Sequence, residues 1–78
     1  MKEDIINIIK ILGIGTTELV LDIDIGILYI NSVEFREPDE VILHSFEGYD
    51  MDIEIDFDDL DLKSKRHIWT LLSILLYN

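Results

Sequence analysis

The sequence predicts an α+β domain: an N-terminal helix, a four-stranded antiparallel meander sheet, and a C-terminal helix packed on one face of that sheet. Two patterns predict this order. Apolar residues recur with helical spacing near both ends of the chain, and they alternate with polar residues through the middle. The connections between strands are short, which favours antiparallel neighbours. No repeat or linker divides the chain, so we expect a single domain over residues 1–78.

The first helix is predicted over residues 1–12. Four apolar residues fall at i, i+3, i+4 and i+7 of one helical face: Ile5, Ile8, Ile9 and Leu12. Ile6 and Ile11 widen this face, and Gly13 is a natural stop. A strand is the alternative because isoleucine is β-branched, but the spacing fits a period of 3.6 better than a period of two.

The first two strands are predicted over residues 18–23 and 27–36, with a turn between them. On the first strand, Leu19, Leu21 and Ile23 alternate with Glu18, Val20 and Asp22. One face of the second strand carries Ile27, Tyr29, Val33 and Phe35, and the other carries Leu28, Ile30, Ser32, Glu34 and Arg36. The Asn31-Ser32 pair in the middle of this strand indicates a bulge or a bend.

The third and fourth strands are predicted over residues 41–46 and 51–57, after a type I turn at 37–40 with Pro38 second and a further turn at 47–50. Apolar and acidic residues alternate through the fourth strand. We expect Met51, Ile53, Ile55 and Phe57 to face the core, and Asp52, Glu54, Asp56 and Asp58 to face water or a partner.

The last helix is predicted over residues 62–76, with Asp59 or Asp61 as its N-cap. Its main apolar face is formed by Ile68, Leu71, Leu72 and Leu75, while Trp69, Ile74 and Leu76 lie outside it. The helix is therefore apolar over more than half of its circumference. We expect it either to lie deep between the sheet and another element or to contact a partner chain.

Acidic residues outnumber basic ones, and the formal net charge is −11. Such a chain should repel nucleic acid and anionic membranes and attract basic partners. Lys63, Lys65 and Arg66 lie in the first turns of the last helix, where cations oppose the helix dipole. We therefore expect them to pair with the acids that precede them.

Chemical motifs are scarce in this sequence. Without cysteine, neither a disulfide nor a thiolate metal site can form. The acids at 50, 52 and 54 faintly match the start of a calcium-binding loop, but Ile55 stands where that loop needs glycine. His44 and Ser45 point to opposite faces of one strand, so they cannot act as base and nucleophile. We expect no catalytic residue, metal or cofactor, and therefore no enzyme.

The function that the sequence favours is that of a small non-enzymatic interaction protein, such as an acidic inhibitor or DNA mimic of a basic protein. The residues expected to bind the partner are Asp52, Glu54, Asp56, Asp58, Asp59 and Asp61. The alternative is a self-associating structural domain whose acids serve solubility, with a possible homodimer formed through Trp69, Ile74 and Tyr77. No secretory signal or membrane span is evident, so we expect a cytoplasmic protein of bacterial or phage type that binds neither membranes nor nucleic acid directly.

Overall fold

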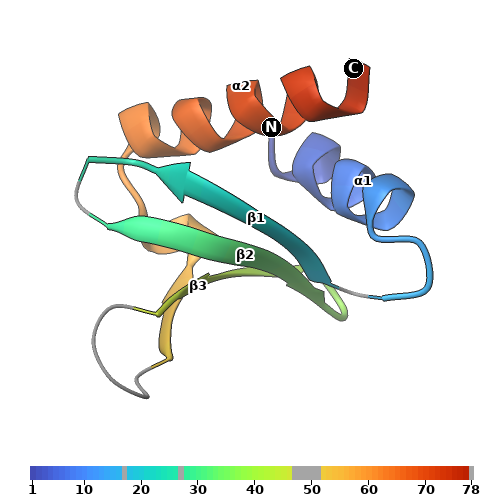
Figure 1. The fold of residues 1–78 in the computed structure, drawn as a ribbon, viewed down its shortest axis with the longest axis horizontal. Helices are drawn as coiled ribbons and strands as arrows, with labels where there is room; N and C mark the ends of the chain where they lie inside the picture. Colours follow the sequence, from blue (N-terminus) through green and yellow to red (C-terminus); the bar gives the residue numbers. More distant parts are fainter. Residues whose placement is uncertain (17, 27, 47–51, 78) are drawn as a thin grey trace.

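The computed structural model of the chain describes residues 1–16, 18–26, 28–46 and 52–77, and for Leu21 it describes the backbone alone. The elements follow in the order α1 (Lys2–Leu12), β1 (Glu18–Asp24), β2 (Tyr29–Arg36), β3 (Glu40–Ser45), β4 (Ile53–Asp56), the 3₁₀ turn η1 (Phe57–Asp59) and α2 (Leu62–Tyr77) (Figure 1). The predicted order of one helix, four strands and a second helix is confirmed.

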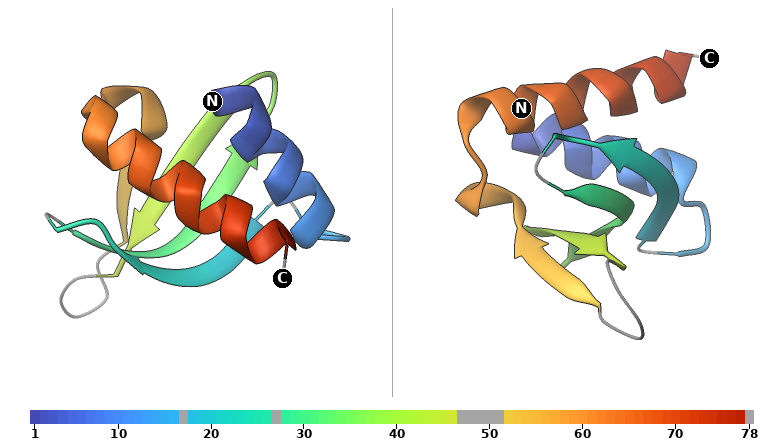
Figure 2. Two further views of the ribbon diagram at one scale, coloured as in Figure 1. Left: turned by 90° about the horizontal axis from the view of Figure 1, so that it is seen from above. Right: turned by 60° about the vertical axis from the view of Figure 1, so that its left-hand side comes forward.

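The sheet is an antiparallel meander in which the strands lie in the order β1-β2-β3-β4. Both helices cover the same face of this sheet and run in roughly the same direction (Figure 2). We call the opposite face the outer face. The residues that the strand register places on it are Glu18, Val20, Ser32, Glu34, Arg36, Glu40, Ile42, His44, Glu54 and Asp56.

The core lies between the helices and the sheet. Its fully buried side chains include Ile5 and Ile9 from α1 and Ile68 and Leu72 from α2. The sheet contributes a row of register partners across three strands, namely Val33, Leu43 and Ile55. The sequence contains no cysteine, so no disulfide or thiolate metal site contributes to this core. The core is stabilised by apolar packing, as the sequence predicts.

For two residues, the prediction that they lie on the buried face of a helix is wrong. Ile11 and Leu75 are about half exposed, at 52% and 44% of their surface. The buried stripe of α2 instead follows every fourth residue through Ser64, Ile68 and Leu72. One more step along this ridge reaches Leu76, which packs partly buried against the core in place of Leu75.

The bend predicted at Asn31-Ser32 is confirmed, and it corrects the predicted faces of β2. Between Val20 and Ile23, β1 holds one residue more than the facing part of β2, from Ser32 to Ile30. The Oδ1 atom of Asn31 accepts a hydrogen bond from the backbone N–H of Phe46 at 2.8 Å. Beyond this bend Ile30 enters the core and Tyr29 is 44% exposed, opposite to the simple alternation.

Several predicted boundaries also change. β3 starts one residue earlier than expected, and β4 is shortened because Phe57 opens the turn η1. A turn at residues 37–39 connects β2 to β3, as expected, and the peptide bond between Glu37 and Pro38 is cis. The predictions made for Ile27, for the turn at 47–50 and for an inward-facing Met51 lie outside the described residues, as does the side chain of Leu21.

Candidate acidic surface

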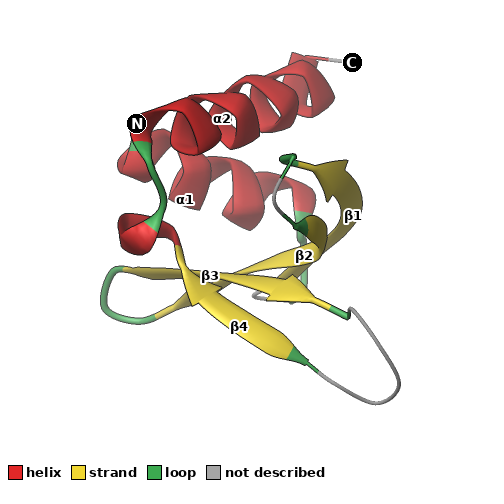
Figure 3. Ribbon diagram, turned by 90° about the vertical axis from the view of Figure 1, so that its left-hand side faces the viewer, coloured by secondary structure: helices red, strands yellow, loops and turns green. Residues whose placement is uncertain are grey.

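β4 forms one edge of the sheet and carries the predicted acidic row (Figure 3). The inward alternation is confirmed, since Ile53 and Ile55 are half-buried and Phe57 is buried at the end of the strand. On the opposite side of the strand, Asp52 and Glu54 are exposed. The charged side chains of β4 thus stand at an edge that other chains can reach.

The turn after β4 holds the remaining predicted acids, and two of them have local structural tasks. Asp56 accepts a hydrogen bond from the backbone N–H of Asp58 at 2.9 Å and so starts η1. Asp61 accepts one from the N–H of Ser64 at 2.9 Å, which makes it the N-cap of α2. Hydrogen bonding from the side chain of Ser64, and then from its backbone N–H, lowers the pKa of the Asp61 carboxyl. Asp59 is exposed and forms no ion pair or hydrogen bond within the part of the chain that the structure describes.

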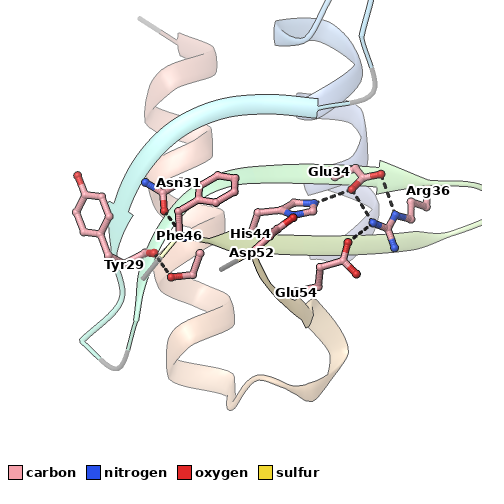
Figure 4. Close-up of polar contacts among 9 residues, drawn as sticks. Tyr29, Asn31, Glu34, Arg36, His44, Phe46, Asp52 and Glu54 are labelled. Carbon is pink, nitrogen blue, oxygen red and sulfur yellow. Dashed lines mark hydrogen bonds and ion pairs between the residues drawn. The ribbon is translucent and has the colours of Figure 1, made fainter. Parts of the chain in front are cut away.

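Five charged side chains form an alternating series across three strands, which we call the ion chain: Asp52, His44, Glu34, Arg36 and Glu54 (Figure 4). The Nδ1 atom of His44 lies 2.9 Å from Oδ1 of Asp52, and its Nε2 atom lies 2.6 Å from Oε1 of Glu34. Arg36 donates to Glu34 through Nε at 2.8 Å and Nη2 at 3.1 Å, and it also donates to Glu54.

The geometry of the ion chain defines the charge of His44. Ionised carboxylates only accept hydrogen bonds, so an imidazole with a carboxylate at each nitrogen must carry both protons. Burial lowers the pKa of His44, but the bonds to Asp52 and Glu34 outweigh it and raise the pKa above its ordinary value. Arg36 likewise lowers the pKa of Glu34, with His44 adding to this against partial burial. Three carboxylates are thus joined by two cations.

Three of the six acids predicted to bind a partner therefore form ion pairs with cations of the same chain. Asp52 and Glu54 belong to the ion chain, and Asp58 pairs with Lys2 of α1 at 2.8 Å. Among the described residues, no ion pair is formed by the other three acids, Asp56, Asp59 and Asp61. The six carboxylates do not form one continuous free row.

The expected pairing of the cations at the start of α2 is wrong. Within the described ranges, Lys63, Lys65 and Arg66 form no ion pair, although Lys63 helps to lower the pKa of Asp61 at longer range. The amino group of Lys65 instead lies 5.7 Å from the ring centre of Phe57.

Glu34, Arg36 and His44 were not predicted from the sequence as partners of the acidic strand. The turn between β2 and β3 holds the signal that identifies them. Arg36 and Glu40 are partners next to this turn. Counting outward from them pairs Glu34 with Ile42 and then Ser32 with His44. All of these residues lie on one face of the sheet. A strand register counted from that turn therefore brings His44 beside Glu34.

A possible cation position exists in the ion chain. Glu34, His44 and Glu54 each offer one ligand atom, and these atoms lie within 4.8 Å of one another. The guanidinium of Arg36 already bonds to both glutamates, and His44 holds its protons between two carboxylates. The cations of the chain itself occupy the place that a metal ion would need.

A second surface lies on the exposed side of α2. Trp69, Ile74 and Tyr77, the residues predicted for self-association, line one open groove together with Thr70 and Ser73. Ile74 is 51% exposed and Tyr77 is 86% exposed. The three predicted residues are thus brought together, in contrast to the six acids.

Comparison with known proteins returned no matching family model, no similar curated protein and no similar solved structure. Among the described helices, none is long and apolar enough to cross a membrane. A function must therefore be argued from the two surfaces of the molecule itself.

Proposed function

We propose that this chain is a small, non-enzymatic protein-interaction module that binds a basic surface of another protein. The contact surface is the edge formed by β4, η1 and the start of α2, and among the described residues its carboxylates without an ion pair are Asp56, Asp59 and Asp61. An inhibitor or DNA mimic acts in this way, with carboxylates placed where a basic protein would meet phosphates. The partner is a protein whose binding face is rich in lysine and arginine.

The distribution of cations supports this proposal. Lys2, His44 and Arg36 neutralise only half of the six carboxylates on this edge, in a chain whose net charge is −11. Asp59 is exposed and unpaired among the described residues. Several carboxylates without a paired cation on one exposed edge attract a basic partner from a distance and accelerate its association. The unpaired acids of this edge are the observation that carries the proposal.

The structure allows the charges to be removed without removing the hydrogen bonds. Asparagine keeps the side-chain oxygen that Asp56 and Asp61 use to cap η1 and α2. We therefore choose the triple variant Asp56→Asn, Asp59→Asn, Asp61→Asn. Wild-type protein is used to capture basic proteins from a bacterial lysate, and each captured protein is purified and titrated against the wild type and the variants by calorimetry.

The variant is expected to weaken such a complex about tenfold or more, with a shallower dependence on salt. The charge-matched control carries Glu3→Gln, Glu18→Gln and Glu37→Gln, which lie on other parts of the surface. It should retain affinity within about threefold of the wild type. Equal weakening by both variants would show that only the total charge matters and would overturn the assignment of this edge.

A second candidate function, self-association through α2, is favoured by the groove that Trp69, Ile74 and Tyr77 share. No acidic or basic side chain occurs from residue 68 to residue 77. The side chains that line the groove are uncharged, and Asp4 of α1 lies beside it, so two copies can meet through the groove with little repulsion between like charges. The occupant of the groove in this case is a second copy of the chain.

Sedimentation as a function of protein concentration tests this second candidate. A dimer formed through the groove should be abolished by Ile74→Glu, because the carboxylate would be buried at the interface. Ile11→Glu is the matched control, since Ile11 is 52% exposed on α1 and does not line the groove. A monomer mass at every concentration contradicts the candidate.

A further inference from the structure

His44 lies at the point where the edge strand is attached to the ion chain. Only 8% of its side chain is exposed, and its two nitrogens bridge Asp52, just before β4, to Glu34 on β2. A neutral imidazole has one N–H donor and one acceptor. After losing a proton it can serve only one of the two carboxylates, and its bare nitrogen then faces the lone pairs of the other.

The two carboxylates are not held equally. Glu34 is fixed by two further hydrogen bonds from Arg36, and its side chain is 20% exposed. The side chain of Asp52 is 46% exposed and has His44 as its partner among the described residues. Loss of the proton should therefore release Asp52 and leave Glu34 in place.

The charged groups around His44 favour the protonated state. From β2 it faces Glu34, with Arg36 beyond it, and Ser32 is its uncharged register partner. On the other side it faces Asp52, and Glu54 is its register partner on β4. The carboxylates outnumber the single guanidinium in this set, so the protonated imidazole partly balances the local charge.

We propose that proton loss from His44 frees the carboxylate of Asp52 and so strengthens the binding of basic partners by the acidic edge. The regulation rests on the proposed function, because it acts on the same surface. Deprotonation removes one positive charge from the ion chain and adds one unpaired carboxylate at the start of the edge strand that carries Glu54 and Asp56. Affinity for a basic partner should then rise as the pH rises through the range in which His44 titrates.

The first part of the test observes the isolated protein by NMR. In the wild type, the side-chain carboxyl carbon signal of Asp52 should shift with the same midpoint as the His44 imidazole, whereas the signal of Glu34 should move less. The exposed His67 on α2 provides an internal comparison, because none of the described contacts joins it to Asp52. An Asp52 signal that does not follow His44 overturns the proposed release.

The second part measures binding of a short poly-lysine peptide, whose side chains stay charged over the range used. Between about pH 6 and pH 8.5 the wild-type affinity should rise about two- to fivefold. His44→Gln should remove this rise, and His67→Gln should retain it. Binding that does not depend on pH overturns the regulation and leaves the proposed function standing. Release of Asp52 without peptide binding at any pH overturns the proposed function instead.

Discussion

Leu72→Ala is expected to bring the chain close to global unfolding. Leu72 is completely buried, in the centre of the stripe through which α2 contacts the core. Truncating a buried leucine typically lowers the free energy of unfolding by about 2–5 kcal/mol, because transfer energy is lost and a cavity remains. A core in a domain of this size supplies only about 3–5 kcal/mol of net stability. The loss is therefore comparable with the whole.

Urea denaturation followed by tryptophan fluorescence measures this effect, since Trp69 is the single tryptophan and lies on the same helix. Leu75→Ala is the matched control. It removes the same atoms from the same helix at a position that is 44% exposed. We expect it to lower the free energy of unfolding by no more than about 1 kcal/mol. Similar losses from both substitutions would contradict the observed orientation of α2.

The fold could be predicted from the sequence because local patterns determine most of it. The helical spacing of Ile5, Ile8 and Ile9 places these residues in the core, and the alternation through Ile53, Ile55 and Phe57 gives the inward side of the fourth strand. Short connections left few alternatives to a meander. Each of these features depends on neighbours in the sequence, and each is confirmed.

The errors arise where contacts between distant segments decide the outcome. The Asn31-Ser32 pair signals the bend in β2, but the change of its buried side goes with the extra residue in β1 between Val20 and Ile23, which β2 alone does not reveal. The choice of Leu76 over Leu75 depends on the angle at which α2 crosses the sheet. A helical period alone does not define that angle.

In the candidate site, too, local pattern reveals some features and contacts between distant segments decide the others. Its acids could be identified as a group from the sequence, but their partners could not be found from local pattern. Arg36 and Glu54 are eighteen positions apart, and Lys2 and Asp58 are fifty-six apart. Only strand register and helix placement bring these charges together. The nearby cations Lys63, Lys65 and Arg66 were the simpler choice by sequence distance, and that choice was wrong.

The stability of the protein is expected to fall as the pH rises through the titration range of His44. Because Asp52 and Glu34 raise the pKa of the folded-state imidazole despite its burial, the folded protein binds this proton more tightly than the unfolded chain does. The stabilisation is complete below the ordinary histidine pKa of about 6.5 and is lost as the pH passes the folded-state pKa. Thermal unfolding midpoints measured from about pH 6 to pH 9 should decrease accordingly.

His44→Gln should remove most of this decrease, because glutamine cannot gain or lose the proton, whereas His67→Gln should preserve it. Glu34 contributes in the opposite range. The pKa of Glu34 is lowered mainly by Arg36 and also by His44. The stability that Glu34 adds to the folded protein is therefore present above the ordinary glutamate pKa and is lost as the pH falls through the lowered value. Stability should therefore be greatest at mildly acidic pH. A slope that is the same in the wild type and in His44→Gln would contradict a protonated His44 between Asp52 and Glu34.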